Sequence, residues 1–213
     1  MIRILTVISV LLLFALTVCG CNGKAETAKT GGPAQNEPSA AGADASKQEK
    51  DVLVVYFSAT GTTKGVAEKI AKITGGDLRE IKPAKEYTGG DLDWNDPQSR
   101  STKEQNDPSA RPEIGGEPVS LDGYSVVYVG YPIWWGQEPR IMDTFAESCR
   151  FDGVTVIPFC TSGSSGIGKS GKNLAKTAGS GNWLDGKRFG AGASEQEIRS
   201  WIDGLQQKLQ KAE

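Results

Sequence analysis

The feature that most constrains the fold of this sequence is a short apolar run followed at once by a hydroxyl-rich turn and an amphipathic segment. The run is Val52–Phe57, and three of its six residues are valine. A continuous apolar run of this length predicts a strand that is buried on both faces, as in a parallel sheet. Val66, Ile70 and Ile73 follow at helical spacing, so we expect a helix that ends at the glycine pair 75–76.

The same alternation continues along the chain. We expect further strands over 78–81, 125–131, 153–159 and 183–189, and helices over 140–149, 169–178 and from Ser194 onward, where Glu197 completes a capping box. This order predicts an α/β fold, a doubly wound parallel sheet with helices on both faces. Residues 82–121 show no periodicity, and we interpret them as a long loop that is either functional or partly disordered.

The amino-terminal 21 residues have the pattern of a targeting segment. Arg3 precedes an apolar stretch over 4–18, which is short for a transmembrane span. Small residues before Cys21 resemble the lipobox of bacterial lipoproteins, and Cys21 fits better than Cys19 because Gly20 precedes it. We therefore expect an exported chain, lipid-anchored through Cys21 on the extracytoplasmic face of a bacterial membrane. An ordinary secretory signal or an uncleaved anchor is the alternative.

Residues 22–50 contain no aromatic residue and no Leu, Ile, Val or Met. Such a segment cannot bury enough apolar area to offset its ordering entropy, so we predict a disordered tether. The folded domain is then expected over 51–213.

Composition excludes several classes of function. The chain has no histidine, which rules out Ser-His-Asp and Cys-His nucleophiles and removes the commonest metal ligand. We expect no catalytic side chain of these kinds and no metal, and we favour chemistry carried by a cofactor. A net charge of −2 gives no basic footprint for nucleic acid. Cys149 and Cys160 fall at opposite ends of one predicted strand, so we expect two free, mostly buried thiols.

Four hydroxyl side chains lie in the turn between the first predicted strand and its helix. The turn consists of Ser58, Ala59, Thr60, Gly61, Thr62 and Thr63. Hydroxyls and backbone N–H groups at the amino end of a helix bind a phosphate monoester, and a glycine lets the backbone approach it closely. A plain helix cap is the alternative, but capping accounts for one or two hydroxyls rather than four. We therefore predict a phosphate site here.

Two more loops follow the next predicted strands at the same edge of the sheet. The first contains Pro132, Ile133, Trp134, Trp135 and Gly136, and the second contains Thr161, Ser162, Gly163 and Ser164. Adjacent tryptophans in a loop are suited to stack on a planar ring, although one of the pair is expected to pack in the core. The third loop is small and polar, and it either contacts the edge of a flat heterocycle or is a simple glycine-rich turn.

Two nucleotide motifs overlap the third loop. Residues 163–170 match the P-loop pattern G-x-x-x-x-G-K-[ST], and residues 166–171 match G-x-G-x-x-G. No other predicted strand ends in an aspartate suited to hold magnesium, and no acidic residue ends a second strand about 20 positions on. We therefore favour the loop over 58–63 as the phosphate site.

The three loops, in this order, resemble those of the flavodoxins. S-A-T-G-T-T matches their phosphate loop, Y-P-I-W-W-G looks like the loop with the flavin-stacking aromatic in the lipoprotein-associated branch, and P-F-C-T-S-G-S-S-G looks like the third flavin-contacting loop. The resemblance covers residues 51 to about 209, the insert 82–121 included. It implies a five-stranded parallel sheet in the order 2-1-3-4-5, flavin mononucleotide (FMN) as cofactor and low-potential electron transfer. Most flavodoxins lack an export signal, which leaves the redox partner open.

The resemblance also implies roles for single residues. The hydroxyls of the first loop, with the amides of Ala59 and Gly61, would hold the phosphate. Trp134 or Trp135 would stack on the flavin, with Trp134 favoured, and residues 161–164 would line its opposite edge. Three acidic residues of the insert would disfavour the anionic reduced flavin by charge repulsion; they are Asp91, Asp93 and Asp96.

Three functions follow from this resemblance. The first is an electron carrier that serves a redox partner protein or a small-molecule donor or acceptor, with membrane contact through the lipid anchor. The second is an FMN-dependent NAD(P)H:quinone oxidoreductase on the same fold, closed by the insert. The third is a non-redox binding module that keeps the fold without flavin.

Overall fold

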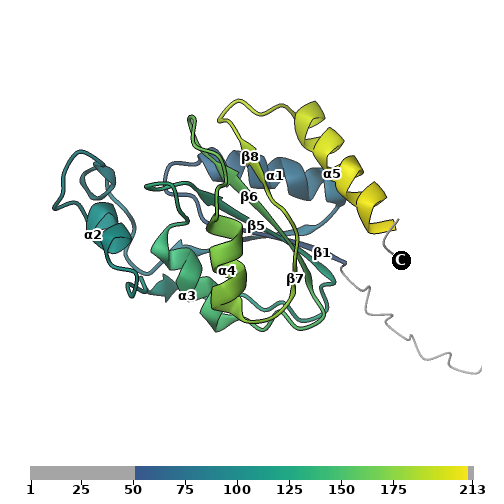
Figure 1. Ribbon diagram of the computed structural model, residues 1–213, viewed down its shortest axis with the longest axis horizontal. Coiled ribbons are helices and arrows are strands. Elements are labelled where there is room, and N and C mark those ends of the chain that lie inside the picture. Colours follow the sequence, from purple (N-terminus) through teal and green to yellow (C-terminus); the bar gives the residue numbers. More distant parts are fainter. Residues whose placement is uncertain (1–50, 211–213) are drawn as a thin grey trace, which may run out of the picture. The chain divides into compact units, whose positions relative to one another are not determined.

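The computed structural model describes residues 51–210 (Figure 1). The targeting segment, Cys21 and the tether expected over 22–50 lie outside the described residues. Among residues 51–210, no helix is both long and apolar enough to cross a membrane.

A parallel sheet forms the centre of the described region. Its strands are β1 (Val52–Tyr56), β2 (Asp77–Glu80), β5 (Val126–Pro132), β6 (Thr155–Thr161), β7 (Asn182–Trp183) and β8 (Lys187–Phe189). They are ordered β2-β1-β5-β6-β7, and β8 also pairs with β6. Because β7 and β8 share the fifth position, this arrangement confirms the predicted order 2-1-3-4-5.

The fifth strand, predicted as one segment over 183–189, is broken into two. Val156 pairs with Trp183 and Phe159 pairs with Lys187, so two residues of β6 face three residues of the edge strand. Leu184 N donates to Val156 O, so the backbone groups of Val156 point toward the edge strand. Backbone groups two residues apart in a strand point to the same side, so those of Pro158 also point toward the edge strand. Proline has no N–H to donate, so the ladder is interrupted there and the extra residue forms a bulge.

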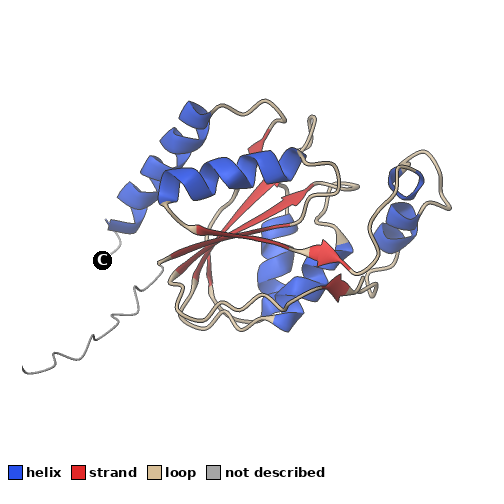
Figure 2. Cartoon of the chain, turned by 180° about the vertical axis from the view of Figure 1, so that it is seen from behind, coloured by secondary structure: helices blue, strands red, loops and turns tan. Residues whose placement is uncertain are grey.

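Helices cover both faces of the sheet, as the alternation predicted (Figures 1 and 2). Helices α1 (Thr62–Thr74) and α5 (Glu195–Gln210) lie on one face, and α3 (Arg140–Ser148) and α4 (Ser170–Ala178) lie on the other. Ser194 Oγ accepts a hydrogen bond from Glu197 N at 3.1 Å, which is one half of the predicted capping box.

The insert 82–121 has more structure than its sequence indicated. It contains β3 (Lys82–Pro83), the 3-10 turn η1 (Gly90–Leu92), α2 (Arg100–Asn106) and β4 (Ile114–Gly115). Strands β3 and β4 pair antiparallel and hold the two ends of the insert together. Helix α2 has no apolar periodicity because its buried residues are polar, namely Ser101, Thr102 and Gln105. An expectation based on apolar spacing therefore misses it.

The two cysteines of the described region are free, as expected. Cys149 is half-buried and Cys160 is buried. Burial raises the pKa of both thiols, that of Cys160 to about 12, so neither is a thiolate at neutral pH.

Gly130 and Gly65 make a matched pair for a stability test. A Cβ added at Gly130, inside β5, would overlap the ring of Phe159 on β6, whereas a Cβ at Gly65 in α1 meets nothing within 4 Å. We expect Gly130→Ala to lower the free energy of unfolding by about 1 to 3 kcal/mol through overpacking. Gly65→Ala is expected to raise it by about 0.5 to 1 kcal/mol through helix propensity. Urea unfolding of both variants checks this; equal effects would contradict the packing account.

Candidate functional site

The three predicted loops meet at the carboxyl edge of the sheet. They follow β1, β5 and β6, which pair in register, Tyr56 with Gly130 and Gly130 with Phe159. Thr63 Oγ1 and Thr161 Oγ1 share a buried hydrogen bond of 2.8 Å, and Ile133 N donates to Thr161 O at 2.9 Å. The third loop is thus bonded directly to the other two.

The first loop presents unsatisfied donors. Gly61 caps α1 in the left-handed conformation, at a φ of 83°, and no side chain caps the helix. Gly65 N makes the first bond of the helix, to Gly61 O, which leaves the amides of the first turn without intrahelical partners. Ser58 Oγ is also buried without a hydrogen-bond partner. The amides, the hydroxyl and the positive end of the helix dipole together make a site for an anion.

The second loop is a two-residue β-hairpin, which we call the aromatic hairpin, residues 134–137. Trp134 N donates to Gln137 O and Gln137 N donates to Trp134 O, both at 2.9 Å. The turn residues Trp135 and Gly136 have φ of 48° and 78°. Positive φ at both positions is the type I′ turn that suits a tight hairpin. Within residues 51–210, Trp135 alone among non-glycine residues has positive φ.

The two tryptophans of the aromatic hairpin have different surroundings. The Trp134 ring meets Phe57 edge-on at 5.6 Å between centroids and Tyr87 of the insert at 5.2 Å. The Trp135 side chain is 42% exposed. One ring is therefore fixed by aromatic packing and the other is displayed, which agrees with the expectation that one of the pair packs inward. Which of them stacks on a ligand stays a prediction.

Two adjoining clefts open at this edge, of about 420 and 460 Å³. Both volumes lie in the range of small-molecule sites. The first is lined by Ser58, Ala59, Thr60, Thr63, Leu92, Trp94, Ser101, Pro132, Ile133, Trp134 and Trp135. The second is lined by Thr60, Thr62, Pro132, Ile133, Trp134, Thr161, Ser162, Gly163, Gly190 and Ala191. Of the residues that the structure describes, none with a charged side chain lines either cleft.

Most of the predicted site residues are brought together in this way, but three line neither cleft. They are Gly61, Gly136 and Ser164. The two glycines instead supply the positive φ that shapes their turns. Five residues that line the clefts were not among the predicted site residues: Leu92, Trp94 and Ser101 of the insert, and Gly190 and Ala191 after β8. Trp94, which is 73% exposed, could have been predicted because it is an aromatic residue in a polar loop. No local pattern marks the other four as site residues.

The three aspartates of the insert that were expected to act on a reduced flavin, Asp91, Asp93 and Asp96, line neither cleft. Asp91 Oδ2 accepts from Thr88 N and Oγ1, at 2.9 and 2.8 Å, and these bonds lower the pKa of Asp91. Asp93 and Asp96 accept from backbone amides two residues on. All three carboxylates stabilise local turns, and their expected effect on a reduced flavin stays a prediction.

The P-loop-like stretch 163–170 is built differently from a triphosphate site. In that motif the final hydroxyl must reach a magnesium ion. Here Ser170 is fully buried, and its Oγ bonds to Tyr131 Oη at 3.0 Å and donates to Ile167 O at 2.6 Å. Arg188 donates to Ser162 O at 2.6 Å and so helps to position the third loop. No local sequence pattern indicates this contact.

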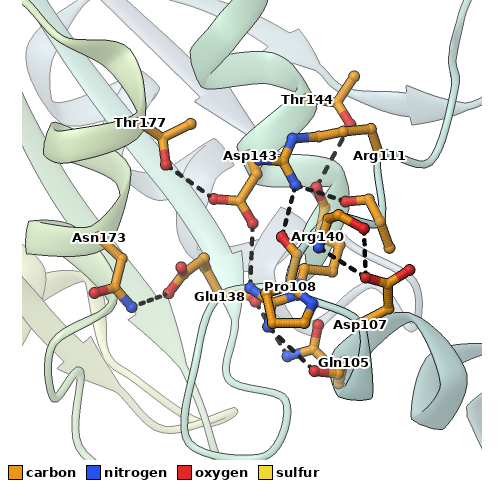
Figure 3. Close-up of polar contacts among 12 residues, drawn as sticks. Gln105, Asp107, Pro108, Arg111, Glu138, Arg140, Asp143, Thr144, Asn173 and Thr177 are labelled. Carbon is orange, nitrogen blue, oxygen red and sulfur yellow. Dashed lines mark hydrogen bonds and ion pairs between the residues drawn. The ribbon is translucent and has the colours of Figure 1, made fainter.

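A buried polar network begins at Glu138, directly after the aromatic hairpin (Figure 3). Asn173 Nδ2 donates to Glu138 Oε2 at 3.3 Å, while Arg140 pairs with Asp143 at 3.4 Å. Glu138 is 1% exposed, and burial is the main cause that raises its pKa from 4.5 to about 7. Asp143 thus has a guanidinium partner, whereas the recorded side-chain partner of the buried Glu138 carboxyl is the amide of Asn173.

This network makes stability depend on pH. The folded-state pKa of Glu138 lies above its unfolded value, so its contribution is fully present below pH 4.5 and is lost as pH rises through about 7. We expect Glu138→Gln to remove this loss and to raise the free energy of unfolding at pH 8 by about 2 to 3 kcal/mol relative to the unmodified chain. Denaturant unfolding at pH 5 and pH 8 measures it, and a gain equal at both values would contradict a raised pKa.

Comparisons with known proteins agree with this geometry. The family model described as Flavodoxin matches residues 51–205. A protein from Bacteroides uniformis ATCC 8492, named as a flavoprotein, is 46% identical with a TM-score of 0.69, over 72% of this chain and 97% of that one. Its namesake from Bacteroides eggerthii DSM 20697 is 49% identical with a TM-score of 0.67, over 72% and 96%.

A more distant structure shares the fold. It is the flavoprotein from Lactobacillus acidophilus NCFM in complex with FMN, 23% identical with a TM-score of 0.51, over 72% of this chain and 99% of that one. No curated protein gives a significant match. The family match covers most of the chain, and the two Bacteroides structures are almost half identical to it, so this chain belongs to the flavodoxin family.

Proposed function

We propose that this chain binds FMN at the carboxyl edge of its sheet and acts as an electron-transfer protein. One observation carries the proposal: the uncapped amino end of α1, with the unpartnered Ser58 hydroxyl beside it, lies directly next to the aromatic hairpin. An anion site joined to an aromatic wall matches a phosphate attached to a planar ring. The L. acidophilus flavoprotein, which shares the fold, is described in complex with FMN.

The first loop would hold the phosphate with neutral donors. The amides of the first turn of α1 and the hydroxyls of Ser58, Thr60 and Thr62 supply hydrogen bonds, and the helix dipole supplies the field. Thr63 would act indirectly, since its hydroxyl is bonded to Thr161 Oγ1. The fixed backbone means that little ordering is required when the ligand binds.

The second and third loops would hold the ring. Trp134 and Trp135 offer aromatic faces, and residues 161–163 offer small polar groups at the second cleft. When bound, FMN supplies reversible electron transfer. The chain's own residues orient the ring and limit the access of water, and the exposed Trp135 and Trp94 leave an apolar rim for a partner.

A second candidate function is an FMN-dependent NAD(P)H:quinone oxidoreductase. The first cleft favours it, because Leu92 and Trp94 extend that cleft beyond the three loops and add space for a planar second substrate. Steady oxidation of NAD(P)H by the FMN-loaded chain in the presence of a quinone would support the enzyme, and single-turnover reduction alone would support the carrier.

FMN titration of the full chain tests the proposed function. We expect binding to quench tryptophan fluorescence and to perturb the visible flavin band, because the ring lies against Trp134 or Trp135. Ser58→Ala should weaken binding about 10- to 100-fold, since it removes a hydrogen bond to a charged group. Ser200→Ala, an exposed serine on α5, is the matched control. The absence of a flavin band at saturating FMN would refute the proposal.

We further propose that Cys21 carries a lipid and holds the domain at a bacterial membrane. The support is the apolar stretch 4–18 and the small residues before Cys21. We expect Cys21→Ser to move the chain from the membrane fraction to the supernatant after carbonate washing in a bacterial host. Cys19→Ser is the control, and equal retention of both variants would contradict lipidation at Cys21.

A further inference from the structure

One side chain of the insert joins both ends of the aromatic hairpin. Gln105 lies in α2 and is 5% exposed. Its Nε2 donates to Trp134 O at 3.0 Å and to Glu138 O at 3.2 Å. The first acceptor belongs to the first residue of the hairpin and the second lies just past its last residue. Because only an NH₂ group can donate to two carbonyls, the orientation of the side-chain amide is fixed.

The hairpin needs such support. Trp135 is held at a φ of 48°, a region that is unfavourable for a residue with a Cβ. Only two backbone hydrogen bonds close the turn, both between Trp134 and Gln137. A two-stranded hairpin of this size is marginal without further contacts. The bonds from Gln105 supply them from outside the turn.

Gln105 is itself held in place by the network of Figure 3. Arg140 Nη2 donates to Gln105 O at 3.1 Å, and Arg140 Nη1 pairs with Asp143 at 3.4 Å. Helix α2 and the start of α3 are therefore connected through buried groups. A shift of α2 would be transmitted to the carbonyls of Trp134 and Glu138, at the two ends of the hairpin.

We propose that Gln105 is a positioning residue that sets the conformation of the aromatic hairpin, and through it the geometry of the flavin site. The insert is then part of the cofactor site rather than a cover for it. This inference rests on the proposed function, since the hairpin is the expected ring-stacking element.

The test compares Gln105→Glu with Gln98→Glu in the full chain. Glutamate has nearly the shape of glutamine, but its carboxylate would face two carbonyl oxygens and repel them. Gln98 is an exposed amide in the same insert, so Gln98→Glu makes the same change of charge without touching the hairpin. Gln105→Met, which keeps the length and removes the donors without adding charge, serves if Gln105→Glu does not fold.

The first measurement is hydrogen exchange without FMN. Loss of the two bonds should raise exchange at the amides of Trp134 and Gln137 about ten-fold or more, and leave the amides of central β5 within about two-fold. The second measurement is the visible circular dichroism of the FMN-saturated chain, which should change for Gln105→Glu and not for Gln98→Glu. If Gln105 merely stabilised the fold, its substitution would lower the melting temperature and leave the circular dichroism of the bound flavin unchanged.

Each outcome decides a separate claim. Unchanged exchange at the hairpin in a folded variant, or an equal rise at all amides, would overturn the positioning role. If the unmodified chain fails to bind FMN, the proposed function fails, and the exchange measurement still decides whether Gln105 sets the hairpin.

Discussion

The parallel register of β1, β5 and β6 is the constraint on which the rest of this structure depends. Tyr56, Gly130 and Phe159 lie side by side across three strands, so the loops that follow begin at the same edge. Gly130 is part of this arrangement, because the ring of Phe159 occupies the space a side chain would need. The hydrogen bonds between the loops, such as Thr63 with Thr161, become possible only after the strands are aligned.

Neutral groups dominate the site that results. Among residues 51–210, no charged side chain lines either cleft, so in the proposed function the attraction for a phosphate would come from the uncapped amides and dipole of α1. Three charged residues near the site are buried, namely Glu138, Arg140 and Asp143. Their polar contacts connect the end of the hairpin to α3 and α4 (Figure 3). In the proposed function, the backbone dipoles of α1 would face the ligand, whereas buried ion pairs and hydrogen bonds hold the aromatic hairpin in place.

The sequence predicted those parts whose signal is local. The run Val52–Phe57 predicts a buried strand, because burial on both faces requires a continuous apolar run. The hydroxyl-rich turn after it predicts an anion site, because a helix follows that turn. Helix α2 was missed because it buries polar side chains. The break at 184–186 was missed because its cause, Pro158, lies on another strand. Ser101 and Gly190 reach the clefts only through tertiary packing, which no local pattern records.

We propose that the amino end of α1, and not the P-loop-like stretch 163–170, holds the phosphate of a flavin. A crystal structure of the full chain with FMN would decide between the two sites. We expect the phosphate against the amides of 60–63, with Ser58 Oγ donating to it and the ring against Trp134 or Trp135. A phosphate bound at 163–170, or a ring that lies away from the aromatic hairpin, would contradict it.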